Sequence, residues 1–117
     1  MVGVDTPDET ITELRGLVEV IDDTIARLEA VRQRAAYIEG RRLDGDLYRV
    51  IVAAEERPLI VESLSMVLDS LATAAGRFRR AEAAALHGEG WTHERIAQFF
   101  GVTRQRIGIL LNRERVR

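Results

Sequence analysis

Thr103, Arg104, Gln105 and Arg106 stand together near the C-terminus, within the run WTHERIAQFFGVTRQRIGILLNR of residues 91–113. An Arg side chain can donate two hydrogen bonds to a guanine edge, and Gln can pair in the same bidentate way with adenine. Thr103 suits the cap of a helix, and the N-terminus of a helix attracts phosphate. These residue types at the start of a helix therefore favour recognition of bases in double-stranded DNA.

The elements that would hold this cluster are two short helices joined at Gly101. Thr92 can cap the first helix, and Thr103 can cap the second. Gly101 adopts the positive φ of a tight inter-helix turn without steric cost, and Val102 fills the angle between the helices. The apolar residues expected to face inward are Ile96, Ala97, Phe100, Ile107, Leu110 and Leu111. This arrangement predicts a helix-turn-helix with its recognition helix at about residues 103–113.

The run RRAEAAALHGEGWTHERIAQFFGVTRQRIGILL resembles the three-helix helix-turn-helix of bacterial DNA-binding regulators, over about residues 77–113. Its pattern is similar to the promoter-reading C-terminal region of sigma factors and to the DNA-binding end of resolvases. The 76 preceding residues are too few for a resolvase catalytic domain. The whole chain also resembles small actinobacterial proteins with this C-terminus. The resemblance implies base-edge contacts from Thr103, Arg104, Gln105, Gly108 and Ile109. Gly108 departs from the family pattern, in which a polar residue is usual, and this puts direct base contact there in doubt.

Charge is distributed unevenly along the chain, whose net charge is −2. Residues 1–76 contain 8 Arg against 15 Asp and Glu, a net charge of −7, whereas residues 77–117 contain 9 Arg against 4 Glu, a net charge of +5. A basic end on an acidic body indicates that this end meets a polyanion. The residues expected to contact DNA phosphates are Arg79, Arg80, Thr92, Arg106 and Arg113.

A long N-terminal helix is predicted to begin at residues 6–9 (TPDE), where Thr6 can cap the helix and Pro7 suits its first position. Gly40 is its predicted end. Apolar residues recur in heptad steps of three and four at Ile11, Leu14, Val18, Ile21, Ile25 and Leu28. We expect this stripe to pair two copies of the chain, because proteins of this kind commonly read two half-sites as dimers. The alternative is that the stripe packs against residues 60–78 of the same chain.

The middle of the chain continues the helical pattern. Residues 43–45 (LDG) predict a turn, and residues 47–56 most simply form a short helix, although YRVIV alone could form a strand. After Pro58, a second apolar stripe predicts a helix that persists to about His87. Gly76 could mark a break in that helix or a close crossing with another one.

The predicted fold is therefore all-α: a long N-terminal helix and a helical hairpin, followed by a three-helix helix-turn-helix. We expect residues 1–76 to form a helical, dimerising region and residues 77–117 to form the DNA-binding domain.

Composition and motifs argue against other functions. There is no Cys, and His87 and His93 have no carboxylate at ligand spacing, so no metal site is expected. No phosphate loop or nucleophile–base arrangement occurs, so neither an enzyme nor a cofactor is expected. Without a secretory signal or a membrane-length apolar run, a cytoplasmic location is expected. The remaining alternative is an adaptor, whose long helix engages another regulator or a polymerase component and whose helix pair never contacts DNA.

Overall fold

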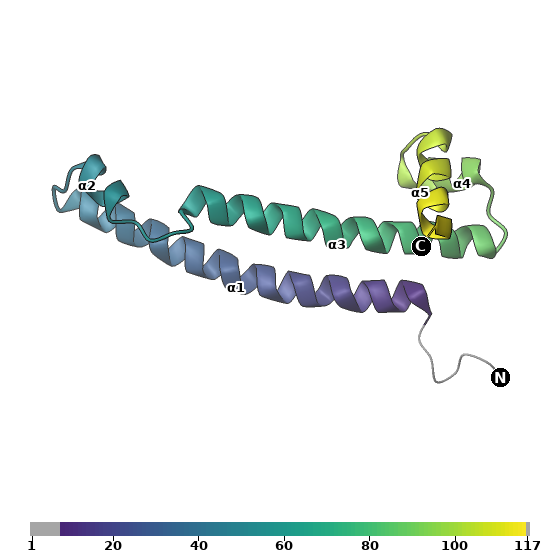
Figure 1. The fold of residues 1–117 in the computed structure, drawn as a ribbon, viewed down its shortest axis with the longest axis horizontal. Helices are drawn as coiled ribbons and strands as arrows, with labels where there is room; N and C mark the ends of the chain where they lie inside the picture. Colours follow the sequence, from purple (N-terminus) through teal and green to yellow (C-terminus); the bar gives the residue numbers. More distant parts are fainter. Residues whose placement is uncertain (1–7, 117) are drawn as a thin grey trace. The chain divides into compact units, whose positions relative to one another are not determined.

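The structure is a computed structural model that describes residues 8–116, with side chains described to residue 112. Over this range the chain forms five helices and no strand, which confirms the all-α prediction (Figure 1). The helices are α1 (Glu9–Leu43), α2 (Tyr48–Ala53), α3 (Ile60–Gly88), α4 (His93–Phe100) and α5 (Arg104–Val116). None of these described helices combines the length and the apolar character that a membrane crossing requires.

The first helix begins and ends at different residues from those predicted. Thr6 and Pro7 lie outside the described residues, and Asp8 caps the helix by accepting a hydrogen bond from the Ile11 N–H at 2.8 Å. Gly40 does not end the helix, which continues to Leu43. The positive φ that a glycine stop supplies occurs instead at Gly45, with a φ of 100°.

The short helix and the long helix that follows it were predicted correctly. Residues 47–56 contain α2, and α3 runs unbroken from Ile60 through Gly76 to Gly88. A Cβ atom added at Gly76 would meet nothing within 4 Å. Gly76 therefore marks neither a break nor a close helix crossing.

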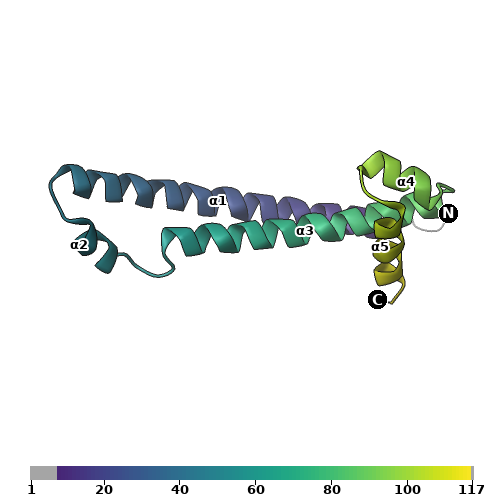
Figure 2. The same ribbon diagram turned by 90° about the horizontal axis from the view of Figure 1, so that it is seen from above.

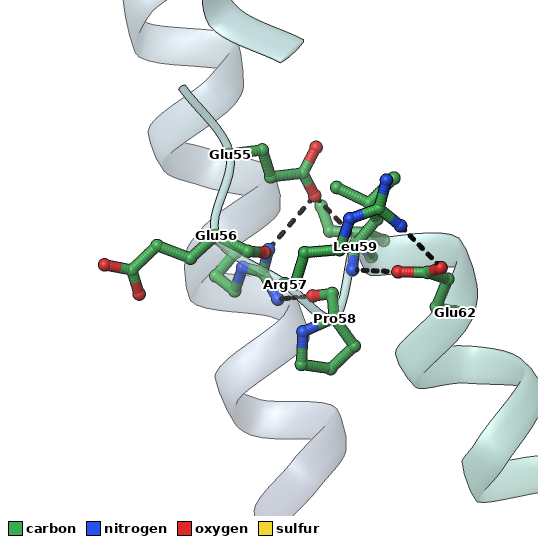
Figure 3. A network of polar contacts seen from close by, with 8 residues as sticks. Glu55, Glu56, Arg57, Pro58, Leu59 and Glu62 are labelled. Atoms are coloured by element: carbon green, nitrogen blue, oxygen red, sulfur yellow. Dashed lines mark hydrogen bonds and ion pairs between the residues drawn. The ribbon is translucent and has the colours of Figure 1, made fainter. Parts of the chain in front are cut away.

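Carboxylates rather than hydroxyls cap the start of α3 (Figure 3). Glu62 Oε1 accepts a hydrogen bond from the Leu59 N–H at 2.7 Å, and Glu55 Oε1 accepts one from the Ile60 N–H at 2.9 Å. The first of these bonds lowers the pKa of Glu62 below its ordinary value, and the nearby charge of Arg57 acts in the same direction. Two of the amides that lack a partner at a helix start are thereby satisfied.

Arg34 of α1 ties the loop before α3 to the first helix. Its guanidinium donates to the carbonyl oxygens of Pro58 and Glu56, each at 2.7 Å, and to Glu55 Oε1 at 3.1 Å. Because Glu55 also accepts from the start of α3, one carboxylate links α1, the loop and α3. This network is the main polar connection in this part of the chain.

The chain divides into two compact units. The hairpin unit is Glu19–Ala72, in which α1 and α3 run side by side in both views (Figures 1 and 2). The C-terminal unit contains the described residues of Met1–Val18 and Thr73–Arg117. Within it, the Thr10 hydroxyl donates to the Ala81 carbonyl oxygen at 3.2 Å and so joins α1 to α3. The functional division between residues 1–76 and 77–117 stays a prediction.

The predicted heptad stripe is not the buried side of α1. Its members, Ile11, Leu14, Val18, Ile21, Ile25 and Leu28, are between 39% and 56% exposed. The buried residues of α1 are Thr24 and Val31, which lie on a neighbouring stripe of the same helix. The stripe therefore does not form the core of the intrachain hairpin.

Candidate nucleic-acid interface

The turn between α4 and α5 has the geometry that its sequence requires. Thr92 caps α4, because its hydroxyl oxygen accepts a hydrogen bond from the Arg95 N–H at 3.2 Å. Gly101 ends the helix with φ of 70° and ψ of 33°, in the left-handed region. The Val102 N–H donates back to the Ala97 carbonyl oxygen at 3.0 Å, and this bond closes a Schellman motif. The predicted turn at Gly101 therefore has the expected backbone conformation.

A compact apolar core fixes three helices around this turn. Ile96 of α4 and Ile107 of α5 are both 0% exposed and are the largest fully buried side chains of the described residues. Ala83 contributes from the last turns of α3, which act as the first helix of the three-helix unit. The buried cluster consists of Ala83, Ile96, Ala97, Ile107, Leu110 and Leu111, and Ala84, Leu86, Trp91, Phe100 and Val102 pack against it. The side chains on the inner face of α5 therefore pack it against α3 and α4.

The polar cluster of α5 lies on the opposite, exposed side. Thr103 caps the helix by accepting a hydrogen bond from the Arg106 N–H at 3.1 Å. Arg104, Gln105 and Arg106 in the first turn are exposed. None of their described side-chain atoms makes a hydrogen bond within residues 8–112. Their side chains are available to an external partner.

The two later positions of the expected base-contacting set differ from each other. Ile109 is 49% exposed on the outer face of α5 and is the kind of side chain that packs against a thymine methyl group. Gly108 is only partly buried, and a Cβ atom added there would meet nothing within 4 Å. Gly108 can offer a partner close backbone approach but no side-chain contact.

Sequence reasoning missed one residue on this face. Asn112 is exposed and lies seven residues after Gln105, which is two helical turns along the same side of α5. Asn can pair with an adenine edge in the same bidentate manner as Gln. The spacing of four and seven residues from Gly108 and Gln105 was the signal that could have identified it.

The residues expected to contact phosphate come from three helices of the C-terminal unit. Arg79 is exposed, with its guanidinium carbon 5.7 Å from the centre of the Phe100 ring. Arg80 is partly buried, whereas Thr92 and Arg106 are exposed beside the starts of α4 and α5. Arg113 belongs to α5, but its side chain lies outside the described residues.

Five of the seven arginines of the hairpin unit pair with a carboxylate, and Arg42 and Arg49 are the exceptions. All five ion pairs among the described side chains lie in the hairpin unit. Within residues 8–112, the arginines of the C-terminal unit that form no ion pair include Arg77, Arg79, Arg80, Arg95, Arg104 and Arg106. Arg95 stacks on Trp91, with its guanidinium carbon 4.5 Å from the ring centre. Arginines without an ion-pair partner can bind an external anion without breaking an existing pair.

The two histidines lie together but do not form a metal site with the described residues. The His87 and His93 rings are 4.8 Å apart, and His87 Nδ1 is 3.1 Å from the Trp91 carbonyl oxygen. Across the described part of the chain, no three His, Cys, Asp or Glu side chains gather as metal ligands. These rings join the end of α3 to the start of α4.

Comparison with protein-family models, with curated proteins and with solved structures finds no match to this chain. Its function therefore has to be inferred from the geometry and charge of the site.

Proposed function

We propose that the protein binds double-stranded DNA at specific sequences and regulates transcription in the cytoplasm, as a dimer that places α5 of each copy in the major groove. The supporting observation is the first turn of α5. There, Arg104 and Gln105 are exposed at the N-terminus of a helix whose other face is anchored by the buried Ile107. Rigid placement of bidentate side chains is what direct readout of base edges requires.

Charge supports the same proposal. The basic residues around α5 have no carboxylate partners among the described side chains, so binding DNA breaks no ion pair in that set. Arg79, Thr92 and Arg106 belong to the phosphate-contacting set, in which they fix the register of the protein on the duplex. Thr103, Arg104, Gln105 and Ile109 form the base-reading set, to which we add Asn112.

A second candidate function is a protein-interaction adaptor, which the half-exposed apolar stripe of α1 favours. In that case the long helix engages another regulator or a polymerase component, and the arginines of the C-terminal unit stay solvated. The two candidates differ in what the C-terminal unit binds, so a DNA-binding measurement separates them.

The test begins by selecting preferred sequences from random duplexes and sequencing the bound fraction. Fluorescence polarisation then compares the preferred duplex with a scrambled one at two salt concentrations. Arg104→Ala and Gln105→Ala should each cost about 1–3 kcal/mol on the preferred duplex and much less on the scrambled one. Arg32→Ala, which removes an exposed arginine of the hairpin unit, is the matched control and should change neither affinity.

Two outcomes would contradict the proposal. Equal losses of affinity on every duplex would show that Arg104 and Gln105 do not read sequence. Wild-type protein that binds no duplex at either salt concentration would leave the adaptor function as the better account.

A further inference from the structure

The hairpin unit has one apolar side that the described residues leave exposed. On α1, Ile21 and Ile25 each follow by one residue an inward-facing residue, Val20 and the buried Thr24. On α3, Leu68 follows the buried Val67 in the same way. One residue is a rotation of about 100° around a helix axis. Because α1 and α3 run in opposite directions, this advance turns both stripes toward the same side of the pair.

This side of the hairpin unit, which we call the apolar face, carries six large apolar side chains. They are between 36% and 73% exposed. The residues of the apolar face are Ile21, Ile25, Leu28, Val61, Leu64 and Leu68. Arg32, which follows the buried Val31 on α1 and pairs with Glu29, lies on the same stripe after Leu28. An exposed apolar patch of this kind is uncommon on a monomeric protein and marks an interaction surface.

The opposite side of the same two helices is more polar, with Tyr37, which precedes Ile38, as the large exposed hydrophobic residue of α1 on that side. Glu19 and Asp23 precede Val20 and Thr24 on α1, where the apolar face has Ile21 and Ile25. On α3, Glu62 is exposed on this side, and Met66, which precedes Val67, is its one large apolar residue. The large exposed aliphatic side chains of α1 and α3 in this unit are therefore concentrated on the apolar face.

The hairpin unit has few buried residues. Within residues 19–72, only Thr24, Val31, Ile51 and Val67 are buried. A unit of this size needs a larger core, a disulfide, a metal or association with another chain. The chain contains no Cys, and no metal-ligand group occurs among the described residues. Association with another chain would bury the exposed apolar side chains and enlarge this core.

We propose that a second copy of this chain covers the apolar face, so that two hairpin units form a four-helix bundle around a twofold axis. A second copy fits for two reasons. The charged residue of the face, Arg32, is already paired with Glu29 of its own helix, and two identical apolar faces bury each other in an isologous contact. If association stabilises the folded hairpin, its partner must be available whenever the chain is made. A second copy of the same chain meets that condition.

This inference deepens the proposed function and rests on it only in the step from two copies to two DNA half-sites. It extends the dimerising surface from α1 to α3, since Val61, Leu64 and Leu68 contribute half of the apolar face. In this inference, the residues of the apolar face contact the second copy. The inward-facing residues contact the neighbouring helix of the same chain.

The test uses a matched pair of substitutions on either side of the buried Val67. Leu68 and Met66 are 66% and 52% exposed, so Leu68→Glu charges the apolar face and Met66→Glu charges the polar side of the same helix. Sedimentation velocity of the full chain, without DNA, should give the wild type and Met66→Glu the mass of two 13.2 kDa chains. Leu68→Glu should raise the dimer dissociation constant by on the order of 100-fold or more, because the charge would be buried without a partner.

Cysteine cross-linking keeps the test decisive if Leu68→Glu fails to fold. The chain has no Cys, so Leu68→Cys and Met66→Cys each introduce a single thiol for a short bismaleimide linker. Leu68→Cys should give a covalent dimer and Met66→Cys should not. Wild-type protein with the mass of one chain at high micromolar concentration would overturn the inference, as would equal cross-linking of the two cysteine variants.

The outcome can be distinguished from failure of the proposed function. If the inference is right, Arg104→Ala stays dimeric, and Leu68→Glu loses affinity for a duplex with two half-sites but keeps its affinity for a single half-site. A dimer that binds no DNA would leave this inference standing and remove the proposed function. A monomer that selects a DNA sequence would do the reverse.

Discussion

The two units of the chain differ in how completely they bury their apolar side chains. In the C-terminal unit, three short segments meet at a corner, and Ile96 and Ile107 are fully enclosed by their neighbours. In the hairpin unit, four of the described residues are buried, and large apolar side chains are exposed along one side of α1 and α3. The first unit closes its own core, whereas we propose that a second copy of the chain covers the exposed side chains of the second.

Charge separates the two units in the same way. In the hairpin unit, arginines such as Arg34, Arg41 and Arg57 bond carboxylates at 2.7–3.1 Å and hold the loops at its end. In the C-terminal unit, the described arginines have no such partners. One arginine set stabilises the chain itself, and the other is free to bind an external anion. This difference supports the proposals that copies of the chain associate through the hairpin unit and that the C-terminal unit contacts DNA.

The largest expected effect tests whether the C-terminal unit is held by its own core. Ile107→Ala removes a side chain that is 0% exposed and should lower the free energy of unfolding by about 2–5 kcal/mol. Ile109→Ala, on the same helix at 49% exposure, is the control and should cost less than about 1 kcal/mol. Urea denaturation followed by circular dichroism measures both. Equal losses would show that α5 is not anchored by its inner face.

The next effect concerns the backbone of the turn. Gly101→Val should destabilise the C-terminal unit by more than about 1 kcal/mol, because a β-branched residue is strained at a φ of 70°. Gly108→Ala is the contrasting change within a helix, where nothing lies within 4 Å of an added Cβ, and should stabilise by up to about 1 kcal/mol. Thermal melting of both variants checks the sign. A Gly101→Val variant that melts like the wild type would refute the turn assignment.

A smaller effect separates phosphate contact from base contact. Arg79→Ala should weaken binding to preferred and scrambled duplexes about equally, and should flatten the plot of log affinity against log salt by about one unit. Arg57→Ala removes an arginine that is paired with Glu62 in the hairpin unit and should leave the slope unchanged. Polarisation titrations over a salt series measure the slope. Identical slopes for wild type and Arg79→Ala would remove Arg79 from the phosphate-contacting set.

The C-terminal unit could be predicted from sequence because its signals are local. Thr92, Gly101 and Thr103 lie within twelve residues, and each determines the backbone within a few residues of itself. The caps and the turn conformation were therefore predicted correctly. Asn112 was missed only because its place on the outer face depends on counting two turns past Gln105.

The hairpin unit was harder to predict because its determinants are not local. The heptad pattern beginning at Ile11 is regular, but a neighbouring stripe through Val20, Thr24 and Val31 faces inward, and one residue of register separates the two. Gly40 resembled a stop, yet a glycine within a helix costs only about 1 kcal/mol, and Gly45 supplies the left-handed turn. The bonds from Arg34 to residues 55–58 join positions more than 20 apart in sequence, which no local pattern reveals.

The smallest expected effect tests whether carboxylates stabilise the start of α3. The Leu59 N–H and Arg57 favour the ionised form of Glu62 in the folded chain and so lower its pKa. A carboxylate with a lowered pKa contributes stability that is present above its unfolded pKa and is lost as pH falls through its folded pKa.

Glu62→Gln keeps an oxygen acceptor for Leu59 but loses the charge. The wild type should therefore be more stable than Glu62→Gln at neutral pH, and the difference should disappear in acid. Glu62→Ala also removes the acceptor and should stay less stable than Glu62→Gln at both ends of the pH range. Urea denaturation of the three proteins from neutral to acid pH measures these differences. A gap between wild type and Glu62→Gln that stays constant with pH would show that the charge on Glu62 does not stabilise the helix start.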